Sequence, residues 1–273
     1  MRFAKGHGTG NDFVILPDPD AELAMTPGLV RALCDRRFGI GGDGVLRVVR
    51  AAKHPDSAHL ADRAEWFMDY HNADGSVAEM CGNGVRVFAR YLTDTGLVSA
   101  ATFPVATRAG VVTAVIAADD VTVDMPHPVL GPRSVARHHR TGERFAGTSV
   151  NVGNPHLVCP VDDVTRLDLT GPPGYDHELF PEGVNVEFFS LAEPIEGRDT
   201  HVRMRVYERG SGETLSCGSG ACAVAKVALH RAAVTFGIAA VDLPGGRLTV
   251  TIAGDACVLS GPAIIVATGE LLV

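Results

Sequence analysis

The chain has 273 residues, 46% of them hydrophobic and 21% charged, which is typical of a folded globular protein and excludes a disordered chain. This length accommodates one large domain or two domains of ordinary size. The formal net charge of −8 disfavours a nucleic-acid partner, because phosphate binding needs a basic patch and none is visible.

The sequence predicts a cytoplasmic protein with no membrane contact. Residues 1–8 lack the apolar run of a signal peptide, and no run of about 18 apolar residues could span a bilayer. Thiols stay reduced in the cytoplasm, so the six cysteines are not expected to form a disulfide framework. No metal site is expected either, because the one close pair, Cys217 and Cys222, has no matching second pair.

The first half of the chain is expected to consist of short strands around one helix. Alternating and apolar runs predict strands at residues 12–16, 45–49, 65–70, 111–116 and 121–123. Residues 27–38 read as helical. A second, central helix is expected over residues 81–93, where a glycine-rich turn runs into an apolar stretch headed by Cys81.

A loop at residues 39–44 matches the dinucleotide-binding pattern G-x-G-x-x-G. That pattern binds a dinucleotide only when a strand precedes it and a helix follows. Here the helical segment 27–38 precedes the loop and the strand 45–49 follows it. The order is inverted, so no dinucleotide cofactor is expected at this loop.

The second half repeats the same plan. Strands are expected at residues 156–159, 184–189, 200–207, 248–252 and 256–259, and a helix headed by Cys217 at residues 217–231. The Pro- and Gly-rich stretch 125–134 is interpreted as the linker between the halves. The predicted domains are therefore residues 1–124 and 125–261, with a last strand within residues 262–273 returning to the first domain.

Four segments of the first half recur in the second half in the same order. The sequence MCGNGVRVFAR around Cys81 resembles SCGSGACAVAK around Cys217, and GNDFV at residues 10–14 resembles GNPHL at residues 153–157. Further matches pair residues 44–48 with 183–187, and 66–75 with 202–211. An ordered set of this kind indicates a duplicated fold. Short strands around one helix in each half favour a small barrel or a curled sheet.

The two cysteines are the strongest functional signal in the sequence. Each is expected at a helix N-terminus, where unpaired backbone N–H groups and the helix dipole favour a negative charge. A thiol in that position is expected to have a lowered pKa and to act as a base or nucleophile. Two such thiols on two related halves suggest one active site approached from both faces.

These motifs together resemble the diaminopimelate epimerase family. The resemblance covers essentially the whole chain and is carried by GTGNDF at 8–13, FGIG at 38–41, NADGS at 72–76, MCGNG at 80–84, GNPH at 153–156 and ERGSGETLSCGSG at 208–220. It implies an α+β fold of two pseudo-symmetric domains, each a β-barrel-like sheet around a central helix. It also implies an active site in the cleft between the domains.

The resemblance implies a cofactor-independent isomerase of lysine and peptidoglycan precursor biosynthesis, which interconverts LL- and meso-2,6-diaminopimelate. Inverting an α-carbon requires removing a proton from one face and delivering one to the other, and Cys81 and Cys217 would supply the thiolate and the thiol. The helix ends at Gly82, Asn83, Gly218 and Ser219 would bind the α-carboxylate and stabilise charge that develops on it. Pyridoxal phosphate would then not be required.

Further polar residues are implied to bind the distal end of the substrate. The family pattern assigns this role to Asn72, Asn154, Asn185 and Arg209, with Asn11 and Glu208 also lining the site. An arginine can bind a carboxylate bidentately and a glutamate suits an ammonium group. The resemblance also implies that His156 and Glu208 modulate the pKa values of the two cysteines.

Alternatives stay open at this point. The same two-thiol chemistry could act on lysine, histidine or proline, although Arg209 would then have no distal carboxylate to bind. A duplicated binding protein could share the fold without using its thiols. Read singly, the asparagines are also typical turn residues. Some relatives carry an aromatic residue at a dimer contact where this chain has Ala267, so a homodimer is left open.

Overall fold

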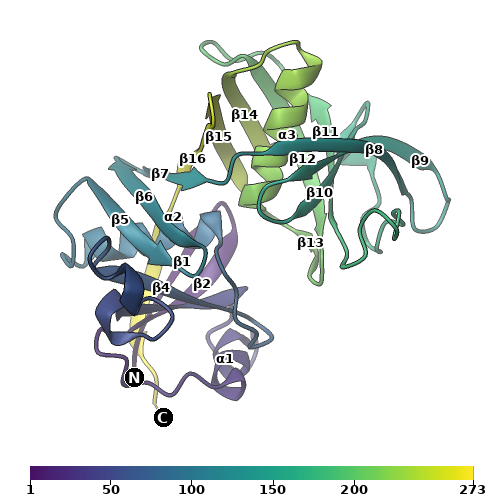
Figure 1. The fold of residues 1–273 in the computed structure, drawn as a ribbon. Helices are drawn as coiled ribbons and strands as arrows, with labels where there is room; N and C mark the ends of the chain where they lie inside the picture. Colours follow the sequence, from purple (N-terminus) through teal and green to yellow (C-terminus); the bar gives the residue numbers. More distant parts are fainter. Residues whose placement is uncertain (273) are drawn as a thin grey trace. The chain divides into compact units, whose positions relative to one another are not determined.

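The computed structural model describes residues 1–272, which divide into two units (Figure 1). One unit contains Met1–Asp124 together with the chain from Gly261 onward, and the other contains Met125–Ser260. Each unit has one curled sheet and one long central helix, and the first unit also has the short helix α1 (Pro27–Cys34). Among residues 1–272, none of the helices combines the length and apolar character that membrane spanning requires.

The sheet of the first unit has strands in the order β17-β1-β2-β3-β4-β5-β6-β7. Their pairings are antiparallel, antiparallel, parallel, antiparallel, parallel, antiparallel and antiparallel. The strands are β1 (Arg2–Gly8), β2 (Asn11–Pro17), β3 (Gly44–Arg50), β4 (Trp66–Asn72), β5 (Thr102–Thr107), β6 (Gly110–Ala117), β7 (Asp120–Met125) and β17 (Ile264–Glu270). The central helix is α2 (Gly82–Asp94).

The sheet of the second unit has the order β8-β9-β10-β11-β12-β14-β15-β16, with the same succession of pairings. The strands are β8 (Val129–Arg137), β9 (Arg144–Asn151), β10 (Pro155–Pro160), β11 (Asn185–Leu191), β12 (Thr200–Glu208), β13 (Gly212–Thr214), β14 (Gly237–Leu243), β15 (Gly246–Ala253) and β16 (Ala256–Pro262). The small strand β13 forms a hairpin with β12. The central helix is α3 (Gly218–Arg231). Two sheets with identical pairing orders confirm the duplicated fold.

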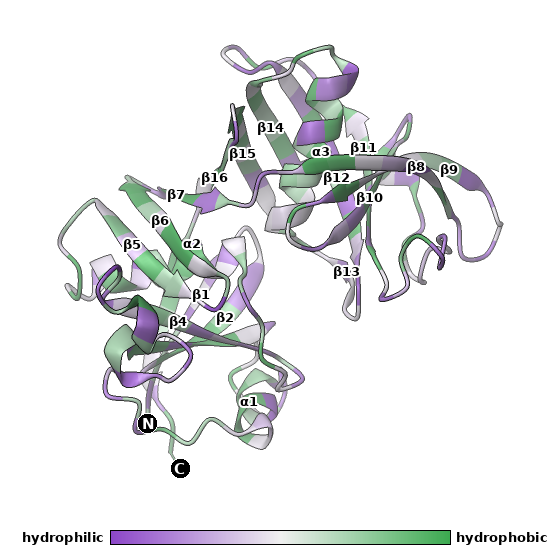
Figure 2. Ribbon diagram, viewed as in Figure 1, coloured by the Kyte–Doolittle hydropathy of each residue, from purple (hydrophilic) through white to green (hydrophobic). Residues whose placement is uncertain are grey.

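Each sheet wraps around its central helix. Helix α2 packs against β17, β1, β2, β3, β4 and β6, and α3 packs against β9, β10, β11, β12, β14 and β15. A helix enclosed in this way must be apolar on most of its surface. In α2 the side chains of Val85, Val87, Phe88 and Leu92 are at most 1% exposed. Figure 2 shows the hydrophobic residues of β6 and β14, two of the strands that face these helices.

Two sequence-based predictions of secondary structure need correction. Residues 125–134 are not a linker throughout, because strand β8 begins at Val129 and pairs with β9. The helix predicted over residues 27–38 ends at Cys34. There the carboxylate of Asp35 accepts hydrogen bonds from the backbone N–H groups of Arg37 and Phe38 at 2.8 Å, which turns the chain. Local propensity cannot predict pairing across the sheet. It also cannot predict a side chain that accepts hydrogen bonds from the backbone of the turn in which it lies.

Candidate active site

Both cysteines of the repeated motif occupy the N-cap position of the central helix of their unit. Cys81 precedes α2 and Cys217 precedes α3, each with extended backbone angles. The sulfur of Cys81 accepts a hydrogen bond from Gly84 N at 3.4 Å, and that of Cys217 accepts one from Gly220 N at 3.4 Å. A thiol therefore stands where serine, threonine or aspartate normally caps a helix. All six cysteines of the chain are free thiols.

The thiol of Cys81 faces an asparagine from β2. Asn11 Oδ1 lies 3.8 Å from Cys81 Sγ and accepts a hydrogen bond from Asn83 Nδ2 at 3.2 Å. The amide nitrogen of Asn11 donates to the carboxylate of Asp43 at 2.8 Å. Because a carboxylate accepts only, Asp43 fixes the Asn11 amide with its oxygen toward the thiol.

A buried arginine supports this arrangement from inside α2. Arg86 is 0% exposed, and its guanidinium donates to Asn83 Oδ1 at 2.9 Å and to Thr9 Oγ1 at 3.3 Å. The sequence analysis did not single out Arg86. The signal available in the sequence was a charged residue flanked by apolar residues in the first turns of the predicted helix.

A network of charged side chains fixes the Asp43 carboxylate that binds Asn11. Arg36 donates to Asp12 at 2.7 Å and to Asp43 at 2.8 Å. These bonds connect the segment that follows α1 with the start of β2. Burial alone would raise the pKa of Asp12, but hydrogen bonds from Arg36 and Lys5 outweigh it and hold that pKa well below its ordinary value. Asp43, Asp12 and Arg36 were also missed from the sequence.

The surroundings of Cys217 form a longer chain of contacts. Cys217 Sγ lies 3.6 Å from Ser219 Oγ, which accepts a hydrogen bond from Asn154 Nδ2 at 3.4 Å. Asn154 Oδ1 lies 2.9 Å from His156 Nε2. The other ring nitrogen of His156 lies 2.6 Å from Glu187 Oε1. Four of these five residues were named from the sequence, and Glu187 was not.

The prediction of a lowered cysteine pKa is wrong for Cys217 in this structure. Burial raises the pKa of its thiol well above the ordinary value, and the carboxylates of Glu208 and Glu187 raise it further. Hydrogen bonds with Gly220 and Ser219 act in the opposite direction but do not compensate. Because desolvation disfavours the charged thiolate, burial outweighs the helix end here. Cys217 is therefore a thiol at neutral pH.

Residues predicted to bind the distal substrate end lie at or next to the ends of β4, β10, β11 and β12. Asn185, at the start of β11, accepts from Arg209 N at 3.0 Å and donates to Pro155 O at 3.1 Å. The Arg209 guanidinium donates to Glu182 O at 3.2 Å. Glu208 accepts a hydrogen bond from the Thr214 hydroxyl. These contacts join the ends of β10, β11 and β12 in the second unit, which also contains Cys217.

Asn72 is the first-unit counterpart of Glu208. It ends β4, as Glu208 ends β12, and its side chain donates to Ser76 Oγ at 3.0 Å within the turn that follows. The structure therefore gathers Asn11, Cys81, Gly82 and Asn83 at the start of α2. It places Asn154, His156, Cys217, Gly218 and Ser219 together at the start of α3.

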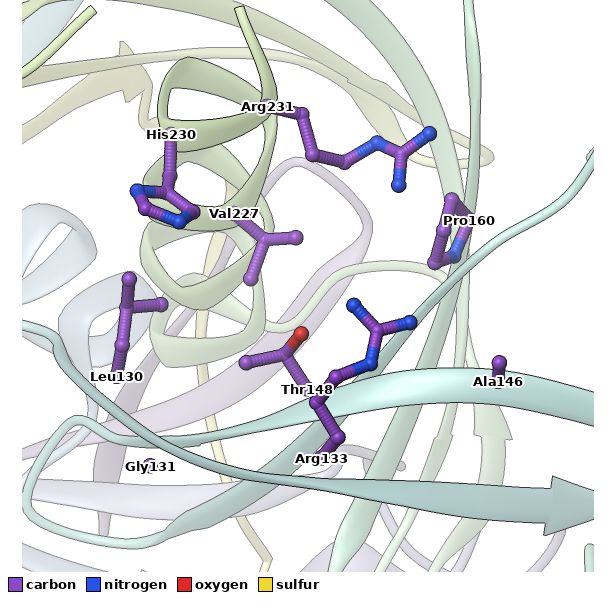
Figure 3. Close-up of a pocket in the computed structure, with 9 residues that line it drawn as sticks. All are labelled: Leu130, Gly131, Arg133, Ala146, Thr148, Pro160, Val227, His230 and Arg231. Carbon is purple, nitrogen blue, oxygen red and sulfur yellow. The ribbon is translucent and has the colours of Figure 1, made fainter. Parts of the chain in front are cut away.

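A separate hollow of about 240 Å³ lies at the other end of α3 (Figure 3). Val227, His230 and Arg231 line it from the last turns of the helix, opposite Leu130, Arg133 and Thr148. A helix of this length spans about 20 Å, so the hollow is remote from the cysteine at the helix start. It contains none of the predicted site residues. Among the described residues, no cluster of three or more acidic, cysteine or histidine side chains could hold a metal ion.

The fold defines a class of proteins built from two such units. The structure resembles a phenazine biosynthesis PhzF-family protein from Enterococcus faecalis with a TM-score of 0.70 and 14% identity, over 100% of this chain and 99% of the other. It also resembles a probable proline racemase from Agrobacterium radiobacter K84 with a TM-score of 0.65 and 15% identity, over 99% and 92% of the two chains. At these identities the likeness shows a shared fold alone.

Sequence similarity identifies the family within this class. The model of the diaminopimelate epimerase family matches residues 3–131 and 148–270. A diaminopimelate epimerase from Thermobifida fusca is 54% identical over 99% of this chain and 98% of its own length. One from Streptomyces coelicolor is 52% identical over 99% and 95%. The chain belongs to the diaminopimelate epimerase family.

Proposed function

We propose that this protein is a cofactor-independent epimerase that interconverts LL- and meso-2,6-diaminopimelate, a step of lysine and peptidoglycan precursor biosynthesis. The observation that carries the proposal is the pair of N-cap cysteines, one in each of two units with the same sheet topology. Full-length identity above 50% to diaminopimelate epimerases supports the choice of substrate. Both thiols must stay reduced to act, which is consistent with a cytoplasmic location.

The two cysteines exchange one proton each with the α-carbon. A thiolate removes the α-proton from one face, and a thiol delivers a different proton to the opposite face, so the configuration inverts and the roles of the sulfurs exchange. The raised pKa of Cys217 makes it the thiol of the resting enzyme. Cys81 is less buried, and it acts as the base once it has lost the proton that its thiol donates to Asn11 Oδ1.

The starts of α2 and α3 stabilise the transition state. Gly82 and Asn83 precede Val85, whose N–H makes the first intrahelical bond of α2, to Cys81 O at 2.8 Å. Gly218 and Ser219 hold the same positions before Ala221 in α3. N–H groups at such a helix end point toward the helix entrance and favour an anion. The substrate α-carboxylate, which gains charge as the proton leaves, is the group they would bind.

The distal amino-acid group of diaminopimelate distinguishes it from simpler substrates. We assign its carboxylate to Arg209, and its ammonium group to Glu208 and the amide oxygens nearby. The amide groups assigned to contact the substrate are those of Asn11, Asn72, Asn154 and Asn185. His156 and Glu208 would modulate the thiol pKa values. Lysine, histidine and proline lack the second carboxylate that Arg209 would bind.

The reaction can be tested directly in D₂O. Reduced protein incubated with LL-diaminopimelate is expected to form meso product carrying one α-deuterium, with little label in early unreacted substrate, as measured by chiral chromatography with mass spectrometry. Cys81→Ala and Cys217→Ala should each lower kcat/KM by at least about 10²–10⁴-fold, since each removes the acid or base of one face.

The matched control is Cys34→Ala, which removes a buried thiol outside the two helix starts and should retain turnover. Normal epimerisation by either active-site variant would contradict the two-base assignment. Absence of both label and meso product would contradict the substrate assignment. The same assay with lysine, histidine and proline would then test the alternative substrates.

A further inference from the structure

Two buried ionisable side chains lie under the start of α3. His156 of β10 and Glu187 of β11 are both 0% exposed, and their atoms Nδ1 and Oε1 are 2.6 Å apart. The strands are parallel neighbours in which His156 pairs with Asn185, so Glu187 lies two residues further along the same face. His156 has a place in the family pattern, whereas the role of Glu187 is unassigned.

The first unit has an apolar pair at the equivalent positions. In the parallel strands β2 and β3, Phe13 pairs with Gly44, so Phe13 and Leu46 correspond to His156 and Glu187. The strand pairing thus matches residues 44–48 with 185–189, two positions beyond the match predicted from the sequence. A Cβ atom added to Gly84 would lie 3.3 Å from Leu46 Cδ2, and one added to Gly220 would lie 2.8 Å from Glu187 Oε1. A methyl group and a carboxylate thus occupy the same place under the two helices.

This difference indicates a role at the second thiol and not in the fold. Burying ionisable groups costs desolvation free energy that an apolar pair avoids. The first unit shows that the fold accommodates the apolar pair in the same topology. The His156–Glu187 pair therefore has no packing advantage that would explain it.

Equivalent asparagines are oriented in opposite senses in the two units. Asn11 presents its amide oxygen to Cys81, because Asp43 accepts from its nitrogen. Asn154 instead places its oxygen against His156 Nε2 and its nitrogen against Ser219 Oγ. With the amide nitrogen donating to it, the Ser219 hydroxyl has its own proton available for Cys217 Sγ, 3.6 Å away.

We propose that Glu187 is a positioning residue that keeps the proton of His156 on Nε2, and thereby holds Asn154 and Ser219 in the orientation that donates a hydrogen bond to Cys217. Asn154 Oδ1 only accepts, so Nε2 of His156 donates to it, and a second proton lies between Nδ1 and Glu187 Oε1. With these two protons the pair is neutral as a whole, so its effect on Cys217 is exerted through this chain of contacts. The donated bond stabilises the thiolate that Cys217 becomes after it has given its proton to the substrate. This inference rests on the proposed function, in which Cys217 is an acid and a base.

The carboxylates of Glu208 and Glu187 are the charged groups that act on the second thiol. The carboxylate of Glu208 opposes its ionisation from β12, and Glu187 does so from β11 if it acts as an isolated charge. Burial raises the pKa of Glu187 and the facing imidazole of His156 lowers it, with burial prevailing. Burial raises the pKa of Cys159 on β10, and the charge of Glu187 raises it further. Removal of Glu187 should therefore lower the pKa of Cys217 if Glu187 acts through its charge, and raise that pKa if Glu187 acts by positioning.

The test replaces the pair by its first-unit counterpart in the double variant His156→Phe/Glu187→Leu. The rate of Cys217 labelling by methyl methanethiosulfonate is measured against pH, with mass spectrometry of peptides to identify the cysteine. The positioning role predicts that the midpoint rises by about one pH unit, because a hydrogen bond to a charged group is lost. An unchanged or lowered midpoint would overturn the proposal, and a lowered one would indicate direct repulsion by Glu187.

Two controls make the assay specific. In Ser219→Ala the midpoint should rise similarly, and adding the double substitution to Ser219→Ala should raise it no further, because both act through one hydroxyl. Additive effects would overturn the proposed route. The Cys81 midpoint, recorded in the same samples, should not change. The melting temperature should not fall, since replacing a buried ionisable pair by apolar residues is often neutral or stabilising.

Because labelling requires no substrate, this experiment and the D₂O assay can fail independently. If the wild-type protein does not epimerise diaminopimelate, the proposed function fails while the labelling midpoint still tests the role of Glu187. If turnover is normal but the double variant leaves the Cys217 midpoint unchanged, only the positioning role fails.

Discussion

At the scale of single residues, two cysteines in the same local sequence have different chemical surroundings. Both cap a helix and both accept a hydrogen bond from the glycine three residues on. Cys81 faces an amide oxygen, while Cys217 is buried and is influenced by the carboxylates of Glu187 and Glu208. The helix end is common to both sulfurs, whereas burial and the neighbouring carboxylates raise the pKa of Cys217.

Glu208→Gln should lower the pH at which Cys217 becomes reactive. The Glu208 carboxylate disfavours a nearby thiolate, so removing its charge lowers the pKa of Cys217 and shifts its labelling midpoint to lower pH. Labelling by methyl methanethiosulfonate with peptide mass spectrometry measures this midpoint. Glu213→Gln is the matched control, because Glu213 pairs with Arg205 at 2.6 Å in the adjoining hairpin. Equal shifts in both variants would contradict a specific effect of Glu208.

At the scale of elements, the first turns of α2 and α3 both have glycine at the position that donates to sulfur, but they differ in the space left for a side chain. A Cβ on Gly220 would lie 2.8 Å from Glu187 Oε1 and 3.3 Å from Cys217 Sγ. A Cβ on Gly84 would lie 3.3 Å from Leu46 Cδ2 and 3.4 Å from Cys81 Cβ. Glu187 is held by His156, whereas a leucine methyl group can move by a few tenths of an ångström.

Gly220→Ala should therefore destabilise the protein more than Gly84→Ala. Alanine in a helix gains up to about 1 kcal/mol over glycine, and overpacking costs about 1–3 kcal/mol. The two terms nearly cancel at Gly84, while the overpacking cost prevails at Gly220. Melting temperatures of the two variants, measured by circular dichroism, test this. Equal melting temperatures would show that the carboxylate yields as readily as the leucine.

At the scale of the whole molecule, the chain returns to its first unit after completing the second. Strand β17 pairs with β1 over Arg2–His7, and Gly6 lies where β1, β17 and α2 meet. A Cβ on Gly6 would lie 2.9 Å from Ile264 O and 2.9 Å from Val87 Cγ1. The sheet of the first unit is thus completed by residues from the far end of the sequence.

Truncation after Pro262 should loosen the first unit selectively. Without β17, strand β1 loses the partner of one edge and α2 loses part of its cover, so hydrogen exchange should accelerate in β1 and α2. Exchange in α3 should stay slow, because the truncation leaves intact the strands that it packs against, which are β9, β10, β11, β12, β14 and β15. Mass spectrometry of exchanged peptides measures both regions. A truncation after Glu270 is the control, and uniform acceleration throughout the chain would contradict the prediction.

Much of the fold follows from local sequence. The central helices, predicted over residues 81–93 and 217–231, are observed as Gly82–Asp94 and Gly218–Arg231. Strands with strong apolar or alternating runs, such as β3 and β15, were also predicted. Strands β1, β5, β8, β9, β13 and β14 were missed. In β1, β8 and β9 the glycine, arginine and serine content weakens the alternation. Pairing across the sheet stabilises those strands, and that pairing is not visible locally.

The sequence alone determined the duplication, the family and the position of each cysteine at a helix start, since glycine-rich turns and apolar helical stretches are local signals. Only the tertiary structure decided what surrounds each sulfur. Asn11 meets Asn83 from 72 residues away, and Glu187 meets His156 from 31 residues away. Burial and the charges of distant neighbours set a pKa, and these are properties of the packed chain. For that reason the raised pKa of Cys217 and the buried carboxylate beneath it emerged only from the structure.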